Sequence, residues 1–592
     1  MTDYTPPLED MQFVINELAR YDLVKALPAY GDYGEDLVKA VLEEAGKLFS
    51  QVLAPLNRIG DHDGVRLNNG NVVMPPGFCE GYAKLMDGGW FALPFPVEAG
   101  GQGFPTVVAV ALMEMMQSAN LAFSMCPLLT AGAVLTLRAF APEVINSAYV
   151  PNLVSGKWSA TMALTEPQAG SDLSEIATKA VANGDHYLLT GQKIFISYGD
   201  HDMAENIVHL VLARMAGAPQ GVKGISLFVV PKYVPDAEGR PGEANDVQPI
   251  SIEHKLGLHA SPTCTMSFGE NGGAKGYLVG EANKGLAYMF TMMNHARLQV
   301  GLQGGALVER AYQDSVAYAR ERIQGLEKGS SDKVAIIEHP DVQRMLMSMK
   351  AGKEAIRAMI YATGAEMDLA EFATEEADRK ARQARVDLLT PIIKGWSTEI
   401  AQELTQLAVQ IHGGIGYIEE TGVTQYLRDA RITTIYEGTS AIQAMDLVRR
   451  KLLKDNGEAF IALLQDIGAS VREADTANKD VRVLAQALEE AVCRLELAIE
   501  QVFRCQENND KWLGAVAFDF MMLSGYVVGG WYMLQSAIVA QRKLESGLTE
   551  DRFYLSKAAT ARFFMNALLP RTAAHAQVVM GKSVVMPNTE WL

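Results

Sequence analysis

The spacing of hydrophobic positions changes twice along the chain. From Gly34 apolar residues recur at helical intervals, which predicts long helices. Between about residues 157 and 280 the apolar runs become short and are separated by Gly, Pro, Asn and Asp, which is typical of antiparallel strands. From Gly285 the helical spacing returns and continues to the end. The helical spacing is seen at Leu37, Val41, Ala45 and Leu48, and the short runs are 187–190, 207–211 and 225–229.

This order of elements predicts a mainly α protein with a central antiparallel β domain. It excludes a doubly wound nucleotide-binding fold, because strands and helices alternate in such folds, and no GxGxxG follows a strand. The predicted segments are a lead segment at 1–35, an N-terminal helical domain at 36–156, a middle β domain at 157–280, a helical domain at 281–455 and an additional C-terminal helical domain at 456–592.

Two uncharged stretches have the length of a membrane span, which needs about 20 apolar residues. The stretch 115–137 is interrupted by Gln117, Asn120 and Pro127, and the stretch 520–540 contains three glycines that indicate close helix packing. A helix that is apolar all round is a core helix in a large protein. We therefore expect the second stretch to be a core helix and the protein to have no transmembrane span.

Composition and charge narrow the possible functions further. The net charge of −18 argues against a nucleic-acid partner, because phosphate binding needs a basic face. The five cysteines are far apart and odd in number, which argues against zinc sites and disulfide frameworks and indicates a reducing compartment. Residues 1–10 are polar and acidic, unlike a signal or transit peptide, so we expect a cytoplasmic protein.

Three motifs carry candidate chemistry. Thr165–Asp172 places small residues between hydroxyls, which suits either a ligand close to the backbone or a simple turn. Gln410–Tyr417 contains three glycines, which suit a passage beside a cofactor or the end of a helix. His412 within it is expected to be packed or capped. In Ile435–Gln443 a capping box of Ser440 with Gln443 predicts that a helix begins there, with Glu437 in the preceding loop as a base or a carboxylate beside the helix dipole.

Taken together, these motifs resemble the acyl-CoA dehydrogenase family, in register over about residues 85–455. Further similarity lies in Pro96–Gly103, in Gly191–Ser197, which resembles the family's flavin-facing strand, and in Arg320–Arg322, which resembles its arginine turn. The long form resembles a bacterial subgroup that includes 3-methylmercaptopropionyl-CoA dehydrogenases. The resemblance implies a helical N-domain, a β-barrel middle domain and a four-helix C-domain, here followed by an extra helical bundle.

The resemblance also implies FAD as the cofactor and Glu437 as the base that removes the α proton of an acyl-CoA thioester. The backbone N–H of Glu437 is expected to help stabilise the thioester oxygen. Arg322, His339 and the Gln410 segment imply contacts with the cofactor of a neighbouring subunit, hence a homodimer or a dimer of dimers. The implied cofactor residues are Met162, Leu164, Thr165, Gly170, Ser171, Phe195, Ile196, Ser197, Arg322, His339, Gln410, Gly413, Gly414 and Thr439, and the implied substrate residues are Ser171, Asn294, Arg297, Glu437 and Arg449.

Four positions depart from the family pattern. Phe195 stands where tryptophan is usual, Ala441 and Pro340 replace glutamines, and Asn294 replaces an aspartate. The indole N–H and one cofactor hydrogen bond are lost at the first two positions, whereas the base is unaffected.

The expected reaction is dehydrogenation of a medium- or long-chain acyl-CoA to the trans-2-enoyl-CoA in fatty-acid β-oxidation, with electrons passed to an electron-transfer flavoprotein. The alternatives are a 3-methylmercaptopropionyl-CoA dehydrogenase and an acyl-CoA oxidase that uses oxygen. A nucleic-acid-associated relative of this fold would carry excess lysine and arginine after residue 455, which this chain does not show. Glu437 argues against an inactive acyl-CoA-binding protein.

Overall fold

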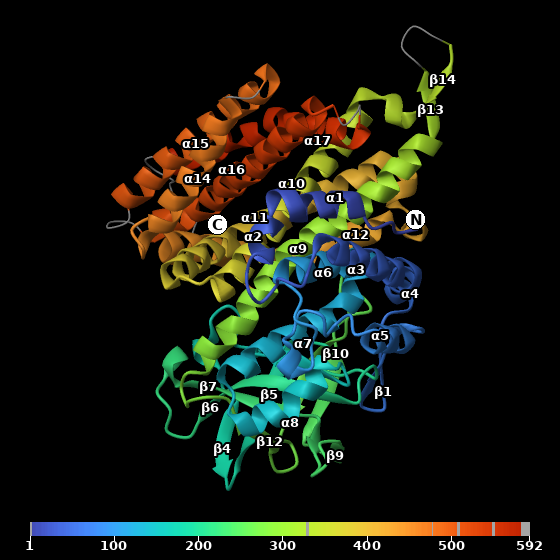
Figure 1. The fold of residues 1–592 in the computed structure, drawn as a ribbon. Helices are drawn as coiled ribbons and strands as arrows, with labels where there is room; N and C mark the ends of the chain where they lie inside the picture. Colours follow the sequence, from blue (N-terminus) through green and yellow to red (C-terminus); the bar gives the residue numbers. More distant parts are fainter. Residues whose placement is uncertain (1–2, 327–330, 476–477, 506–509, 548–550, 582–592) are drawn as a thin grey trace, which may run out of the picture. The chain divides into compact units, whose positions relative to one another are not determined.

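A computed structural model describes residues 3–326, 331–475, 478–505, 510–547 and 551–581. Its internal contacts divide the chain into two compact units. The helical unit comprises Met1–Glu43, Pro105–Glu114 and Val300–Leu592, and the barrel unit comprises Glu44–Phe104 and Met115–Gln299. The predicted fold class is confirmed. Along the chain, helices precede and follow a central β domain, and further helices form the C-terminal segment (Figure 1).

The barrel unit is built around a closed ring of strands. β5 pairs with β12, β12 with β7 and β7 with β6, and β4 closes the ring by pairing with both β5 and β6. β3 extends the sheet from β6, while β11 and then β10 extend it from β5. The strands are β3 (Trp158–Ala163), β4 (Lys179–Asn183), β5 (His186–Ser197), β6 (Asn206–Met215), β7 (Ile225–Pro231), β10 (Val247–Ile252), β11 (Thr263–Phe268) and β12 (Ala274–Leu278).

Two features of this sheet differ from the sequence prediction. The ladders from β6 to β3 and to β4 are parallel, although all strands were expected to be antiparallel. β6 is buried along its first eight residues, because the sheet has neighbours on both faces there, so it lacks the alternation of a half-exposed strand.

Helices cover one face of the barrel unit with a shared apolar core. Phe91, Leu129, Val134 and Leu153 pack with strand residues such as Leu210. The remaining elements of this unit are α4 (Ala54–Asp63), β1 (Arg66–Asn68), β2 (Asn71–Val73), α5 (Phe78–Asp87), α7 (Leu121–Phe140), α8 (Glu143–Val154), β8 (Tyr233–Pro235) and β9 (Pro241–Ala244).

The helical unit contains most of the long helices, and α3, α6 and α9 run from one unit into the other. Its elements are α1 (Leu8–Phe13), α2 (Tyr21–Lys25), α3 (Glu35–Leu48), α6 (Thr106–Ala119), α9 (Gly285–Glu321), β13 (Ile323–Leu326), β14 (Lys333–Ala335), α10 (Pro340–Phe372), α11 (Glu376–His412), α12 (Val423–Arg431), α13 (Ser440–Asp446), α14 (Glu458–Asp475), α15 (Lys479–Cys505), α16 (Asp510–Glu545), α17 (Arg552–Phe563) and α18 (Thr572–Met580).

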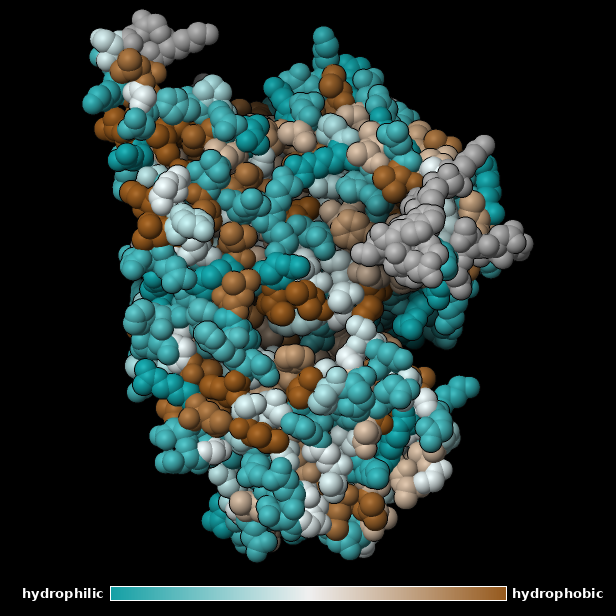
Figure 2. Space-filling view, turned by 180° about the vertical axis from the view of Figure 1, so that it is seen from behind, coloured by the Kyte–Doolittle hydropathy of each residue, from teal (hydrophilic) through white to brown (hydrophobic). Residues whose placement is uncertain are grey.

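The two apolar stretches form buried helices in the described ranges. α7 and α16 are long and apolar enough to cross a membrane by length and composition alone, yet 89% and 78% of their most apolar windows are buried inside the protein. α16 packs against α10, α11, α13, α15, α17 and α18. On the face drawn in Figure 2, apolar residues lie in separate patches among polar ones. The expectation of a core helix at 520–540 agrees with this burial.

The lead segment is buried through the apolar residues that lie between positions 11 and 27. α2 and the π-helical turn that follows α1 (Val14–Leu18) pack on α10, and α1 is joined to α10 by the pair of Asp10 with Arg357. Five of the segment's apolar side chains are at most 6% exposed: Met11, Phe13, Ile15, Tyr21 and Val24. The segment therefore belongs to the core of the helical unit.

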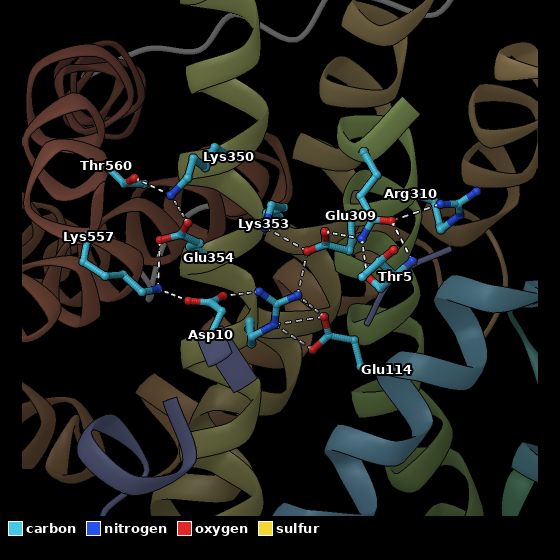
Figure 3. Close-up of polar contacts among 12 residues, drawn as sticks. Thr5, Asp10, Glu114, Glu309, Arg310, Lys350, Lys353, Glu354, Lys557 and Thr560 are labelled. Carbon is cyan, nitrogen blue, oxygen red and sulfur yellow. Dashed lines mark hydrogen bonds and ion pairs between the residues drawn. The ribbon is translucent and has the colours of Figure 1, made fainter. Parts of the chain in front are cut away.

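A buried ion network lies where the lead segment, α10 and α17 meet (Figure 3). Arg357 on α10 donates to Glu114 and Glu309, at 3.0 and 2.7 Å, and also pairs with Asp10 of α1. Lys557 of α17 pairs with Asp10 and, at 3.0 Å, with Glu354 of α10. The network is charge-balanced: its acids are Asp10, Glu114, Glu309 and Glu354, and its bases are Lys350, Lys353, Arg357 and Lys557.

Candidate active site

The loop after β3 is held by a buried carboxylate. Glu166 is 3% exposed and accepts hydrogen bonds from Ala177 N at 2.7 Å and from Thr178 Oγ1 at 2.6 Å. Lys193 of β5 donates to Glu166 at 2.8 Å and to the carbonyl of Leu164 at 2.9 Å. These bonds fasten the beginning of the Thr165–Ser171 stretch to β5 and to the residues that precede β4.

The electrostatics of this pair follow from its burial. Burial lowers the pKa of Lys193 to about 8, and only Glu166 opposes that shift. Burial alone would raise the pKa of Glu166, but Lys193 and Thr178 reverse the effect and hold it below its ordinary value. Both groups are therefore charged at neutral pH, and each is the counter-charge that makes burial of the other tolerable.

Phe195 stands out of the β5 ladder. Its φ is +58° and its side chain is 60% exposed. The register between β11 and β5 shifts here, because Cys264 faces Ile196 whereas Met266 faces Lys193. Such a bulge re-aims a side chain, and a left-handed non-glycine residue costs about 1–3 kcal/mol. An exposed aromatic ring held at that cost is suited to a ligand contact.

The two segments expected to face the flavin are adjacent in the barrel unit. The N–H of Ile194, next to Phe195, donates to the carbonyl of Thr165 at 2.9 Å. Of the predicted residues, Leu164 and Ile196 are buried, Met162, Thr165 and Ser197 are half-buried, and Gly170, Ser171 and Phe195 are exposed.

Glu437 lies in the helical unit in a loop before a helix, as the sequence predicts. It is half-buried, and its φ of +56° is followed by +89° at Gly438. Gln443 Nε2 donates to the Glu437 carbonyl at 3.2 Å and to the Gly438 carbonyl at 3.1 Å. Lys394 Nζ of α11 donates to the Gly438 carbonyl at 2.7 Å. Side chains on two helices thus hold the strained backbone that presents this carboxylate.

The predicted capping box is wrong in its residues. Thr439 is the N-cap of α13, and its hydroxyl accepts from Ile442 N at 3.3 Å. Gln443 turns toward the loop carbonyls, and Ser440 Oγ donates to Glu399 of α11 at 2.5 Å. The helix begins where predicted, but the polar side chains hold the loop of Glu437 as well as capping the helix.

Arg322 and His339 flank the β13–β14 hairpin. Arg322 is exposed at the end of α9, and its carbonyl accepts from Ile336 N at 2.8 Å. His339 Nε2 contacts the Gln324 carbonyl at 2.7 Å, immediately before Pro340 begins α10. The structure therefore ties both predicted residues, seventeen positions apart in the sequence, to the same hairpin.

The glycine segment after α11 is exposed. Gln410, Gly413 and Gly414 face solvent, and a Cβ added to either glycine would meet nothing within 4 Å. His412 is buried instead: Nδ1 lies 2.8 Å from the Ala408 carbonyl, and its ring stacks on Tyr318 at 4.3 Å. Burial lowers its pKa, so the expectation of a packed histidine agrees with the structure.

The predicted substrate residues lie in different surroundings. Arg297 is 5% exposed, and its guanidinium contacts Asn294 Oδ1 at 3.3 Å one turn earlier on α9. Asn294 and Ser171 are exposed, and Arg449 is exposed on the helical continuation of α13. Their contacts with substrate stay predictions.

Sequence reasoning missed the residues that support the site. Lys193 was part of a strand motif without a role, yet a lone lysine in a strand with buried neighbours was a signal for a buried counter-charge. Lys394 and Glu399 carried no such signal, because only the approach of α11 to the loop assigns them. Among the described residues no cluster of three or more His, Cys, Asp and Glu could hold a metal ion.

Four family models match the chain nearly end to end. They describe the N-terminal, middle and C-terminal domains of acyl-CoA dehydrogenases, at 39–157, 161–270 and 283–452, and an acetyl-CoA dehydrogenase C-terminal-like domain at 460–587. The chain belongs to the acyl-CoA dehydrogenase family. The family's enzymes are FAD-dependent oxidoreductases, so FAD is the cofactor of this chain too.

Several relatives match over nearly the whole length of this chain. The 3-methylmercaptopropionyl-CoA dehydrogenase of Ruegeria pomeroyi is 45% identical over 97% of this chain and 98% of its own. A broad-specificity linear acyl-CoA dehydrogenase of Mycobacterium tuberculosis is 34% identical over 98% of each chain. The solved structure of Caenorhabditis elegans ACDH-11 in complex with C11-CoA has a TM-score of 0.77 at 19% identity, covering 99% of this chain and 97% of its own, which supports the fold alone.

The residues in the barrel unit fit a flavin. Phe195 offers an exposed aromatic face, and Thr165, Ser171 and Ser197 supply hydroxyl groups beside it. A Cβ added to Gly170 would meet nothing within 4 Å, so the backbone there is open to a ligand. These residues would hold the ring of FAD, which accepts a hydride when it is bound.

Proposed function

We propose that this enzyme dehydrogenates 3-methylmercaptopropionyl-CoA between its α and β carbons. The observation that carries the proposal is the 45% identity, over nearly the full length of both chains, to an enzyme of that name. The sequence had favoured medium- or long-chain fatty acyl-CoA with this substrate as the alternative, and the comparison favours the alternative. The product is the thioester with a carbon–carbon double bond between the sulfur-bearing carbon and the α carbon.

Glu437 is proposed as the base. Its carboxylate removes the proton from the α carbon, while the β hydrogen leaves with its electron pair as a hydride. A carboxylate presented from a rigid loop suits this step, because a general base must lie within hydrogen-bond reach of its proton. The negative charge that develops on the thioester oxygen would be stabilised by the backbone N–H of Glu437. Arg297 and Arg449 are the cations proposed for the phosphates of CoA.

A linear acyl-CoA is the second candidate, because a broad-specificity linear acyl-CoA dehydrogenase is 34% identical over 98% of this chain. The experiment compares kcat/KM for 3-methylmercaptopropionyl-CoA and pentanoyl-CoA, which differ only by sulfur in place of one methylene, and for butyryl-, octanoyl- and palmitoyl-CoA. The highest kcat/KM is expected for the sulfur compound. A higher value for any straight-chain thioester would overturn the substrate assignment.

An electron-transfer flavoprotein is proposed as the acceptor of the electrons, and a homodimer or dimer of dimers as the assembly. The exposure of Arg322, Gln410, Gly413 and Gly414 supports the assembly, because exposed residues can contact a neighbouring subunit's cofactor, and His339 beside them is half-buried. Turnover with an artificial dye should greatly exceed turnover with oxygen. Equal rates would instead indicate an acyl-CoA oxidase.

A further inference from the structure

α16, in the additional C-terminal segment, interlocks with α11 through two glycines. A Cβ added to Gly525 of α16 would lie 2.2 Å from Cγ of Trp396, and one added to Gly395 of α11 would lie 2.1 Å from Sδ of Met521. Trp396 and Met521 are fully buried. Each side chain therefore occupies the space that the facing glycine leaves open, and the two helix backbones lie in close contact.

The same turn of α11 holds the loop of Glu437. Lys394 precedes the Gly395–Trp396 pair, is fully buried, and donates to the Gly438 carbonyl at 2.7 Å. Glu399, one turn further, accepts from Ser440 at 2.5 Å. The backbone on the C-terminal side of Glu437 is thus tied to α11 at two points, on either side of the place where α16 packs. α16 also contacts α13, the helix that follows this loop.

The loop needs such support because of its conformation. Glu437 has a left-handed backbone, which persists in a residue with a Cβ only when the surroundings determine it from several sides. A catalytic carboxylate must also keep its position closely, since a displacement of about 1 Å can cost about 100-fold in rate. Support from α11 alone would depend on how firmly α11 is itself held.

We propose that the additional C-terminal segment holds the catalytic loop in place. α16 fixes the turn 394–399 of α11, and Lys394 and Glu399 transmit that position to the backbone beside Glu437. Lys394, Trp396 and Gly525 are accordingly positioning residues. This inference rests on the proposed role of Glu437 as the base.

Gly525→Ala tests the proposal, with Gly514→Ala as its matched control. Both glycines lie within α16, but a Cβ at Gly514 would meet nothing within 4 Å, whereas one at Gly525 displaces the rigid indole of Trp396. In the protein without substrate, hydrogen–deuterium exchange of a peptide covering 435–446 should become faster in Gly525→Ala only. The rate of flavin reduction by substrate should fall at least about tenfold, given that sensitivity to misplacement, with acyl-CoA affinity unchanged.

Two further variants cover the case in which Gly525→Ala does not fold. Gly395→Ala is milder, because the end of the flexible Met521 side chain can move aside. Lys394→Met removes the donor to Gly438 and keeps the side-chain length. Each should raise exchange in the peptide and slow flavin reduction. If these variants only lower thermal stability and leave both exchange and reduction as in the wild type, α16 does not position the loop.

Failure of the base assignment would look different. In that case Glu437→Gln would reduce its flavin normally, and slower reduction in Gly525→Ala would have no link to this loop. Faster exchange in Gly525→Ala together with inactive Glu437→Gln supports both statements. Faster exchange in Gly525→Ala together with an active Glu437→Gln would mean that α16 does hold the loop, but that the loop does not carry the base.

Discussion

Glu437 and Phe195 share a left-handed backbone conformation, which a residue with a Cβ adopts rarely. The two belong to different units, and each was selected from the sequence for its chemistry. Each conformation is held by its surroundings. Lys394 donates to the Gly438 carbonyl beside Glu437, and a bulge in the pairing of β5 with β11 holds Phe195. Strain at each of these residues supports a functional role for each within its own unit.

Glu437→Gln should separate binding from chemistry. Glutamine keeps the size of the side chain but cannot accept the α proton, so folding, FAD binding and acyl-CoA binding should persist. Reduction of the flavin by substrate should slow by at least about 100-fold, the lower end of what a positioned base contributes. The rate is measured from flavin absorbance after anaerobic mixing. Near-normal bleaching would mean that another group is the base.

Lys193→Met should cost the protein its cofactor as well as stability. Removing one partner of a buried ion pair leaves the other charge uncompensated, which costs about 3–5 kcal/mol, and here Glu166 also anchors the Thr165–Ser171 loop. Lys232→Met is the control, since Lys232 pairs with the buried Asp200 at 2.5 Å elsewhere in the same unit. Both variants should lower the thermal midpoint of unfolding, but only Lys193→Met should purify with less bound FAD per chain. Equal FAD content would reject the role of this pair in cofactor binding.

At the scale of elements, α6 begins on a carboxylate that belongs to another helix. Asp368 of α10 accepts from Thr106 N at 2.7 Å, from Val107 N at 3.1 Å and from the hydroxyl of Tyr30 at 3.1 Å. It thereby satisfies the first free N–H groups of α6 and links the lead segment to α10. Burial raises the pKa of Asp368 to about 7, although the bonds from Thr106, Val107 and Tyr30 act in the opposite direction.

This raised pKa predicts how stability depends on pH. The folded protein binds the Asp368 proton more tightly than the unfolded chain, whose aspartates titrate near about 3.9. The stabilisation that Asp368 adds to the free energy of unfolding is therefore fully present below about pH 4. It is lost as the pH rises to about 7 and does not change further above that pH. Urea denaturation from pH 4 to 8 measures this. Asp368→Asn should remove that part of the slope, and an unchanged profile in the variant would contradict the assignment.

At the scale of the molecule, distant segments of the chain are joined by the ion network of Figure 3. Its residues come from α1, α6, α9, α10 and α17, so the lead segment and the C-terminal segment meet on α10. Lys353 and Arg357 hold the pKa of Glu309 at about 2, overcoming the effect of its burial. The additional helices are thus bound to the dehydrogenase domains through buried charges as well as through the apolar faces of α16.

Lys557→Met should destabilise this junction. Asp10 and Glu354 would lose a shared counter-charge in a buried site, which costs about 3–5 kcal/mol. Lys543→Met is the matched control, because Lys543 also links the C-terminal segment to the lead segment, through Glu17 at 2.9 Å, but in a solvent-accessible, half-buried pair worth about 0–1 kcal/mol. The midpoint of urea denaturation should fall clearly only in Lys557→Met. Equal midpoints for the two variants would show that the network is not needed for stability.

Arg322→Ala should reveal the proposed assembly. If the exposed Arg322 reaches the cofactor of a neighbouring subunit, the purified variant will contain less FAD per chain while its secondary structure is retained. Arg344→Ala removes an exposed arginine of α10 that pairs with the nearby surface residue Asp341, and should leave FAD content unchanged. Full FAD content and unchanged affinity in Arg322→Ala would mean that the cross-subunit assignment is wrong.

The sequence by itself determined the elements, the family and the chemistry. Hydrophobic spacing is a local property, so it located the helical and β regions, and the residue types around Glu437, Phe195 and Ser171 identified candidates for the base and the flavin contacts. The capping box failed because Thr439, Ser440 and Gln443 can all make hydrogen bonds, and their spacing does not say which partner each one meets.

Only the tertiary structure decided how these residues are held. The pairs Glu166–Lys193 and Lys394–Gly438 join residues 27 and 44 positions apart, and Asp10 meets Lys557 from opposite ends of the chain. The sequence likewise did not say which helix the apolar residues of the lead segment pack against, and the structure places them on α10. Such contacts depend on which helices and strands approach one another, and no local pattern of residues encodes that approach.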